Sequence, residues 1–128
     1  MAEQSSLFIG LRTVIYAAPD IARTKDWYAT ALGIEPYFDE TYYVGFNVGG
    51  FELGLDPNAA TTGAGGATAY WGVANVDDAV TRLVAAGATV SNPPNDVGEG
   101  IRVASVMDPF GNLLGIIQNP HFDPTSTR

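Results

Sequence analysis

The sequence predicts an α+β protein made of two βαβββ modules in tandem, whose mixed sheets curve around a shared cup-shaped cleft. Two observations carry this prediction. The order strand, helix, hairpin occurs twice within 128 residues, and an apolar stripe at helical spacing follows the first strand in each half. One such module leaves a sheet face uncovered, so two paired modules enclose a cleft between their sheets.

The first module, about residues 7–56, opens with a β-rich segment from Leu7 to Ala17. Asp20 has the short acceptor side chain of a helix N-cap, and Gly33 can take the left-handed conformation found just past a helix C-terminus. A short extra strand is expected from Pro36 to Phe38. The helix shows apolar or small side chains at helical spacing, namely Ile21, Thr24, Tyr28, Ala31 and Leu32.

A hairpin with a two-residue turn closes this module. Tyr43 to Val48 and Phe51 to Leu55 are joined by Gly49-Gly50, a pair that suits a tight turn. This turn places Val48 opposite Phe51. The face that packs on the helix then carries six apolar side chains, those of Val44, Phe46, Val48, Phe51, Leu53 and Leu55.

The opposite face of this hairpin is small and polar. It places Asn47 directly opposite Glu52. Its small residues leave room, so this face is either one wall of a pocket or an ordinary solvated face of an antiparallel sheet. The face consists of Tyr43, Gly45, Asn47, Gly50, Glu52 and Gly54.

The second module, about residues 68–118, follows a linker at about 57–67. We expect a strand over Thr68 to Val76 and a helix that starts at Asp77 and ends before Gly87. Thr89-Val90 supplies a short strand, whereas Ser91 to Gly100 has the Pro, Asn and Gly content of a loop and is a candidate lid. The helix has an apolar stripe of Val80, Leu83 and Val84.

Composition favours one domain that spans residues 1–128, with a tail at 119–128 where we expect the single histidine, His121, to lie on the surface. The net charge of −8 and six scattered basic residues oppose binding to nucleic acid. No apolar run approaches the roughly 20 residues of a membrane span. The chain has no cysteine, which is compatible with the cytosol. We expect a cytoplasmic protein without nucleic-acid or membrane partners.

Short motifs fall at matching places along the chain. Pro19-Asp20 precedes the first helix and Leu32-Gly33 ends it, Val76-Asp77 starts the second, and Asp108-Pro109-Phe110-Gly111-Asn112 is a tight polar turn before an apolar strand. With these motifs the chain resembles the vicinal-oxygen-chelate superfamily of glyoxalases, bleomycin-resistance proteins and extradiol dioxygenases. The resemblance implies the two-module fold and a homodimer. It also aligns Trp27-Tyr28 with an aromatic pair, which we interpret as helix packing.

In glyoxalase-like members of this superfamily, one side chain from the first strand and one from the last strand of each module hold a divalent metal. The resemblance carries these positions over to Thr13, Glu52, Trp71 and Gly115. Only Glu52 is a competent ligand, whereas a catalytic site needs about three protein donors. The prediction is therefore no metal at this place and no cofactor.

The closing hairpin of the second module extends the candidate site. Its register places Gly115 opposite Ser105 and Ile117 opposite Val103. With Trp71 and Val73 these residues form an apolar and aromatic wall, in which Trp71 either stacks on a ligand or fills the space of the missing metal. The facing polar wall consists of Thr13, Tyr43, Asn47 and Glu52.

Three roles stay open for Glu52: acid-base catalysis, attraction of a cationic group, or a hydrogen bond to Asn47 at the rim. A lone carboxylate without a second titratable partner is a thin basis for catalysis. The leading hypothesis is a metal-free protein that binds a flat or cationic small organic molecule. The alternative is a lyase, isomerase or dioxygenase-like enzyme with an atypical metal site or Glu52 acid-base catalysis. A scaffold module without any ligand is the third.

Overall fold

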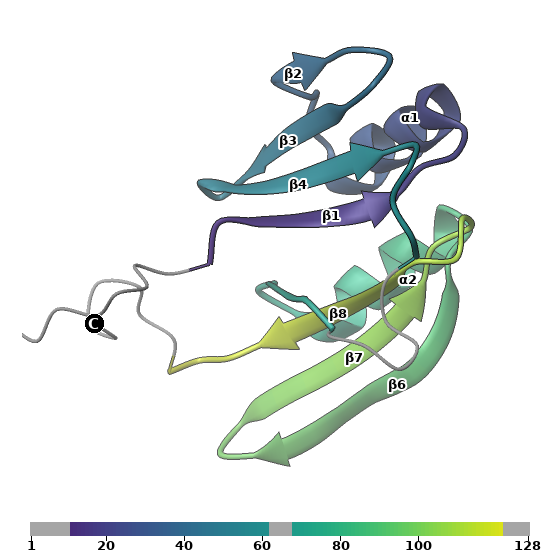
Figure 1. The fold of residues 1–128 in the computed structure, drawn as a ribbon. Coiled ribbons are helices and arrows are strands. Elements are labelled where there is room, and N and C mark those ends of the chain that lie inside the picture. The colour runs from purple at the N-terminus through teal and green to yellow at the C-terminus, as the bar shows by residue number, and fades with distance from the viewer. Residues whose placement is uncertain (1–10, 62–67, 122–128) are drawn as a thin grey trace, which may run out of the picture.

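The computed structural model describes residues 11–61 and 68–121, and it contains two four-stranded mixed sheets (Figure 1). The first sheet has the order β1-β4-β3-β2 and the second has the order β5-β8-β7-β6. This confirms the predicted α+β fold of tandem modules. The first module comprises β1 (Thr13–Ala17), α1 (Ile21–Leu32), β2 (Phe38–Asp39), β3 (Val44–Val48) and β4 (Phe51–Asp56). The second comprises β5 (Tyr70–Gly72), α2 (Val76–Ala85), β6 (Thr89–Gly98), β7 (Ile101–Met107) and β8 (Leu113–Gln118).

Both helices begin and end on local signals. The Asp20 side chain accepts a hydrogen bond from the Arg23 N–H at 3.2 Å, and Gly33 ends α1 in the left-handed conformation with φ +75°. In α2 the N-cap is Asn75, whose side chain accepts from the Asp78 N–H at 3.0 Å. The prediction that α2 starts at Asp77 is therefore wrong by one residue, because Asn75 caps it first.

The two hairpin registers are confirmed. Val48 pairs with Phe51 across a turn in which Gly49 and Gly50 have φ of +62° and +92°, a conformation that strains other residues. In the second module Ser105 pairs with Gly115 in the β7 and β8 pair. Two-residue periodicity then fixes which side chains of each hairpin face the helix.

Several strand predictions are wrong in extent, and the short strand expected from Pro36 to Phe38 lies instead at Phe38–Asp39 as β2. Ser91 to Gly100, expected to be a loop, instead lies mostly in β6, the edge strand of its sheet. An edge strand tolerates Pro93 and Pro94 because its outward N–H groups need no partner, and register shifts between Asn92 and Asn95 absorb the irregular backbone. The strand expected over Thr68 to Val76 shortens to β5. The expected strand residues 7–10 and linker residues 62–67 lie outside the described part of the chain.

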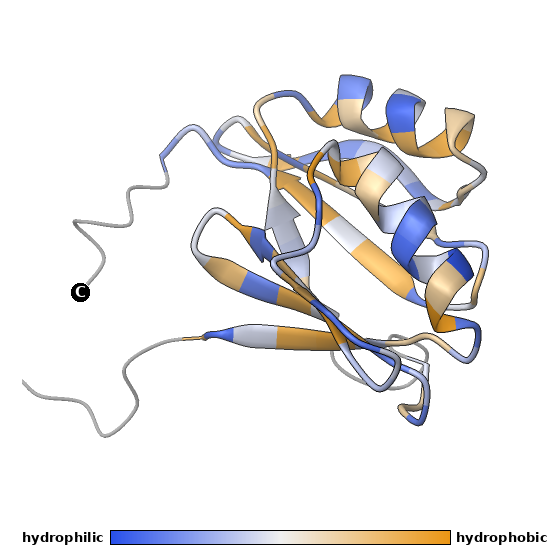
Figure 2. Ribbon diagram, turned by 90° about the horizontal axis from the view of Figure 1, so that it is seen from above, coloured by the Kyte–Doolittle hydropathy of each residue, from blue (hydrophilic) through white to orange (hydrophobic). Residues whose placement is uncertain are grey.

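The helices cover one face of the sheets and leave the other open. Helix α1 contacts β4, and α2 contacts β6, β7 and β8. Seen from above, the two helices lie together on one side of the strands (Figure 2). One hydrophobic core spans both modules and includes Tyr16, Phe46, Leu55, Val76, Val106 and Ile116. At about 25 cal/mol for each Å² of apolar surface removed from water, this core is the main stabilising term.

The Asp108–Asn112 turn joins the modules through buried hydrogen bonds. The Asn112 amide donates to the Ala17 carbonyl at 2.9 Å and accepts from the Ala17 N–H at 3.1 Å. It thereby satisfies both backbone groups at the end of β1. The Asp108 carboxylate accepts from the Asn112 N–H at 2.8 Å and from the Tyr28 hydroxyl of α1 at 2.6 Å. The turn motif thus acts as a fastener between β1, α1 and the β7–β8 connection.

The Trp27-Tyr28 pair packs the helices, as predicted. The Trp27 indole N–H donates to the Ala86 carbonyl at the end of α2, at 2.6 Å. Helix C-termini leave carbonyls without partners inside the helix, so this bond satisfies one of them. The Trp27 ring also lies edge-on to Phe110 with centroids 6.2 Å apart. Trp27 therefore connects both helices to the Asp108–Asn112 turn.

A further polar contact between the modules lies in the core. The Trp71 indole N–H donates to the Tyr16 hydroxyl at 2.8 Å, and Tyr16 is fully buried. Burial raises the pKa of Tyr16 to about 12, the Asp108 charge adds to this rise, and the Trp71 hydrogen bond opposes it. The neutral phenol is therefore the form compatible with the folded core.

Replacing Asn112 with Ala should lower the free energy of unfolding by about 2–4 kcal/mol, because both backbone groups of Ala17 lose a buried partner. Urea unfolding followed by circular dichroism measures this change. Asn58→Ala, at an exposed position, is the matched control and should change stability by less than about 0.5 kcal/mol. Equal losses for both variants would contradict the fastener role.

Stability should fall as the pH rises from about 10 to about 12. The pKa of Tyr16 in the folded protein lies above its ordinary value of 10.0. The contribution of the neutral phenol to folding stability is therefore complete below pH 10 and is lost as the pH rises from there to the folded-state pKa of about 12. A shift of this size corresponds to roughly 2–3 kcal/mol. Denaturant unfolding at successive alkaline pH values tests this. Tyr16→Phe should flatten the decline, whereas Tyr42→Phe, at an exposed position, should leave it unchanged.

Candidate functional site

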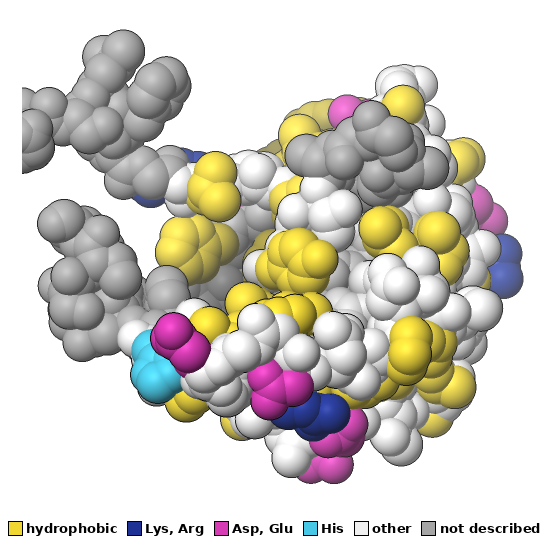
Figure 3. Space-filling model, turned by 90° about the horizontal axis from the view of Figure 1, so that it is seen from below, with side chains coloured by type: hydrophobic (Ala, Val, Ile, Leu, Met, Phe, Trp, Pro, Cys, Tyr) yellow, Lys and Arg dark blue, Asp and Glu magenta, His cyan; other side chains and the backbone are white. Residues whose placement is uncertain are grey.

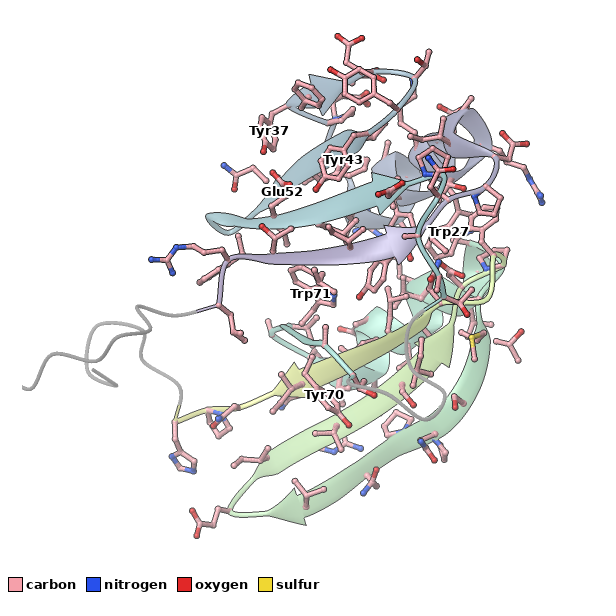
Figure 4. All side chains as sticks on the ribbon, in the orientation of Figure 1. Trp27, Tyr37, Tyr43, Glu52, Tyr70 and Trp71 are labelled. Atoms are coloured by element: carbon pink, nitrogen blue, oxygen red, sulfur yellow. The ribbon has the colours of Figure 1, made fainter. Side chains whose placement is uncertain are left out.

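The open face of the first sheet carries a carboxylate held by two tyrosines. Glu52 lies at the second position of β4, where it pairs with Thr13 of β1. The hydroxyls of Tyr37 and Tyr43 donate to its two different carboxylate oxygens. Figure 4 shows the three side chains together above β4. We call Tyr37, Tyr43 and Glu52 the Tyr-Glu-Tyr cluster.

Two glycines make room for the tyrosine rings. A Cβ at Gly54 would overlap the Tyr43 hydroxyl and lie 2.6 Å from its ring carbon Cζ. A Cβ at Gly45 would lie 3.2 Å from Cε1 of Tyr37 and 3.3 Å from Oε1 of Glu52. The space that the sequence predicted beside Gly45 and Gly54 is therefore filled by the side chains of Tyr37 and Tyr43.

Both tyrosines of the cluster stay protonated to high pH. The hydrogen bond to Glu52 raises the pKa of Tyr37, with further contributions from burial and from the Glu52 charge. Burial raises the pKa of Tyr43 strongly, and the hydrogen bond to Glu52 and the charges of Glu52 and Asp56 add to it. Each phenol therefore acts as a hydrogen-bond donor to the carboxylate near neutral pH.

Asn47 pairs with Glu52 in the register, as predicted, but the structure gives its side chain another partner. Its Oδ1 accepts from the Gly50 N–H at 2.8 Å. This bond supports the hairpin turn. The expectation that Asn47 could hydrogen-bond Glu52 is wrong, because the donors to that carboxylate are Tyr37 and Tyr43, and the Asn47 side chain accepts from the turn instead.

The predicted position of Trp71 is also wrong. Trp71 pairs with Ile116, not with Gly115, so Trp71 and Val73 face the core and pack against it. The residue that pairs with Gly115 is Tyr70, which is 53% exposed. The predicted parity of this strand is wrong by one residue. Because successive side chains point to opposite faces of a sheet, this places Trp71 on the face opposite to the one expected. Figure 4 shows Trp71 between the two sheets and Tyr70 over the second sheet.

The open face of the second sheet has a hollow of about 450 Å³. Within it the Asn92 amide donates to the Ser105 hydroxyl at 3.2 Å. Ile117 lies beside this region, paired with Val103 and Gly72. Figure 3 shows hydrophobic side chains reaching the surface on this side of the molecule. The lining residues all belong to the second module: Tyr70, Asn92, Pro93, Asn95, Val103, Ala104 and Ser105.

The sequence model of the Glyoxalase/Bleomycin resistance protein/Dioxygenase superfamily matches residues 10–116. The chain belongs to this superfamily. No curated protein matches it. The predicted resemblance is thereby confirmed, and the two open-faced sheets are the sheets of this superfamily's fold.

Solved structures show the same fold at low identity. A glyoxalase-related enzyme from Fulvimarina pelagi is 22% identical with a TM-score of 0.70, covering 88% of this chain and 90% of that one. TioX from Micromonospora sp. ML1 is 23% identical with a TM-score of 0.67, covering 89% and 99%. A lactoylglutathione lyase from Agrobacterium tumefaciens is 19% identical with a TM-score of 0.69, covering 91% and 99%.

The metal that the superfamily implies does not fit the residues present. The strand pairings bring together Thr13 with Glu52 and Tyr70 with Gly115, a set with one carboxylate and no imidazole. A Cβ at Gly115 would lie 2.6 Å from Cδ1 of Tyr70 and 2.7 Å from the Ala69 carbonyl oxygen. The Tyr70 ring therefore fills the space that a ligand side chain at 115 would need. Within residues 11–61 and 68–121, no three His, Cys, Asp or Glu side chains group to hold a metal.

His121 is exposed, as expected, and its Nε2 lies 2.8 Å from the Glu99 carbonyl oxygen in the β6–β7 turn. His121 therefore contacts the β6–β7 turn, at the end of β7 opposite to the Asp108–Asn112 turn. Among the described helices, none is both long and apolar enough to cross a membrane.

Sequence reasoning missed Tyr37 and Tyr70. Tyr37 lies just before β2, and its N–H donates to the Gly45 carbonyl at 2.9 Å. The paired glycines Gly45 and Gly54 were the available signal, because adjacent glycines on one face leave space for a large side chain. Tyr70 would have followed from one change in strand parity.

Gly54→Ala should displace Tyr43 from Glu52 and lower the free energy of unfolding by about 1–3 kcal/mol, since the new methyl group overlaps the phenol. The titration of Tyr43, followed by tyrosinate absorbance, should move toward lower pH. Gly72→Ala is the control, because a Cβ there meets nothing within 4 Å. Unchanged stability and titration in Gly54→Ala would contradict this packing.

Proposed function

We propose that this protein is a metal-free small-molecule-binding member of its superfamily, which holds a flat or cationic organic compound on the open sheet faces. The observation that carries the proposal is the donor set at the superfamily's metal positions. It supplies one carboxylate, and the Tyr70 ring fills the space beside Gly115. Binding needs affinity alone, so the loss of metal donors does not impair it.

Shape and charge favour this ligand class. The hollow beside Tyr70 has the size of a small-ligand site and carries apolar side chains with a few amides. Tyr70 takes the stacking role that the sequence had suggested for Trp71. The net charge of −8 attracts cations from solution. Of the predicted site residues, we retain Thr13, Tyr43, Glu52, Val103, Ser105, Gly115 and Ile117, with Tyr37 and Tyr70 added.

The second candidate is an enzyme with Glu52 as acid-base group. The observation in its favour is that Glu52 is half-buried and adjoins two phenols, which is an arrangement that can move protons. Turnover of a substrate that disappears in Glu52→Gln would favour the enzyme. We further propose a homodimer in the cytoplasm, which sedimentation and cell fractionation test.

Purified protein should retain no stoichiometric metal after incubation with nickel, zinc, iron or manganese followed by desalting. The reason is that a single carboxylate is too few donors for a tight divalent site. Elemental analysis measures the metal per chain. About one tightly held metal per chain would contradict the proposal and would place replacement ligands near Glu52.

Proflavine, a planar cation, should bind more tightly than anthracene-2-carboxylate, a planar three-ring anion of similar size. Fluorescence titration measures both affinities. Tyr70→Ala should weaken proflavine binding several-fold, because a well-placed aromatic stack contributes roughly 0.5–1.5 kcal/mol. Tyr42→Ala removes a similarly exposed tyrosine outside the hollow and should leave the affinity unchanged. Absence of proflavine binding, or equal loss in both variants, would overturn the hollow as the site.

A further inference from the structure

The Tyr-Glu-Tyr cluster has a defined set of hydrogen-bonding groups. Each phenol has one O–H donor, and both donors are directed at Glu52. A carboxylate has no donor but can accept about four hydrogen bonds, and each phenol oxygen keeps lone pairs. The three side chains therefore offer acceptors and no donor to anything that approaches from the open face.

We propose that this cluster is the binding site for a protonated primary amine. The inference rests on the proposed function, which includes Tyr43 and Glu52 in the site, and it names the cationic group that binds on the first sheet, apart from the hollow on the second. A primary ammonium has three N–H donors and one positive charge, which match several acceptors arranged around one negative charge. The ammonium binds to the free lone pairs of Glu52, Tyr37 and Tyr43.

The surrounding charge favours a cation. Asp56 follows Glu52 at the same parity of β4, and its charge acts on Tyr43. Lys25 pairs with Asp39 and Arg102 pairs with Asp77. The cations of these two pairs therefore have other partners than the cluster.

Apolar surface lies next to the acceptors. The Phe38 ring is 6.2 Å from the Tyr43 ring and 6.1 Å from the Tyr42 ring. Ile15, which is 42% exposed, pairs with Gly54 on the other side of β4. An ammonium at Glu52 can therefore rest its carbon part on aromatic or aliphatic side chains, and cation–π attraction adds to the hydrogen bonds.

This chemistry distinguishes between similar cations. A quaternary ammonium has the charge but no N–H donor, so it leaves the acceptors unsatisfied. A neutral alcohol has one donor and no charge. A primary ammonium should therefore bind more tightly than either the quaternary ammonium or the alcohol, whereas a plain aromatic cage would prefer the quaternary ion.

The test compares benzylammonium, benzyltrimethylammonium and benzyl alcohol by nuclear magnetic resonance titration of the full chain. Benzylammonium should bind about tenfold or more tightly than the other two, in line with the contribution of a charged hydrogen bond. Glu52→Gln should weaken its binding by at least a similar factor. Asp96→Asn, which removes one exposed negative charge in β6, is the matched control and should leave the affinity unchanged.

Tyr43→Phe gives a second reading that does not depend on Glu52→Gln folding well. It removes one acceptor and one orienting donor, so binding of benzylammonium should weaken several-fold. Equal affinity for benzyltrimethylammonium, or retention of binding in both Glu52→Gln and Tyr43→Phe, would overturn the inference. Loss of binding to the same extent in Asp96→Asn would also overturn it, because net charge would then suffice.

The two proposals fail in different ways. If proflavine binding is lost in Tyr70→Ala but benzylammonium binding is unchanged in Glu52→Gln, the hollow stands as a binding site and the amine site is rejected. Benzylammonium binding that depends on Glu52 while proflavine does not bind would keep the amine site and reject the flat ligand at Tyr70.

Discussion

The buried hydrogen bonds between Asn112 and Ala17 are the constraint on which the rest of this structure depends. Strand β1 lies at an edge of its sheet, where the backbone groups of Ala17 would otherwise be buried without partners. The Asn112 amide satisfies both and thereby sets the β7–β8 turn against β1. Because Asp108 binds both Asn112 and Tyr28, the same contact also positions α1. The turn motif that marks the superfamily is thus a structural fastener.

Once the modules are joined, their helices share one side and their sheet faces remain open on the other. The open faces are then free to differ from those of metal-binding relatives without loss of the fold. In this chain the first face uses glycines to seat Tyr37 and Tyr43 around Glu52, and the second uses Gly115 to seat Tyr70. Aromatic rings therefore occupy the space that the glycines leave on both open sheet faces. The result is a surface on which a carboxylate, hydrogen-bond acceptors and aromatic rings lie together.

The hydrogen-bond partners of Glu52 determine the chemistry available at this position of the fold. A carboxylate that binds a divalent metal needs further donors around the same point in space. Here its neighbours are phenols that donate hydrogen bonds to its two oxygens. The carboxylate keeps its place in β4, and its partners decide what it can bind.

The sequence by itself determined the features that short-range physics controls. The caps Asp20 and Gly33, the Gly49-Gly50 turn and both hairpin registers follow from a few neighbouring residues, and two-residue periodicity then assigns the faces. The start of α2 was missed by one residue, since Asn75 and Asp77 both lie near it. Only the tertiary structure decided the parity of β5, which places Tyr70 on the open face and Trp71 in the core. It also decided that Ser91 to Gly100 pairs as an edge strand and that Tyr37 reaches Glu52. These outcomes depend on contacts between segments far apart in the chain, which no local pattern encodes.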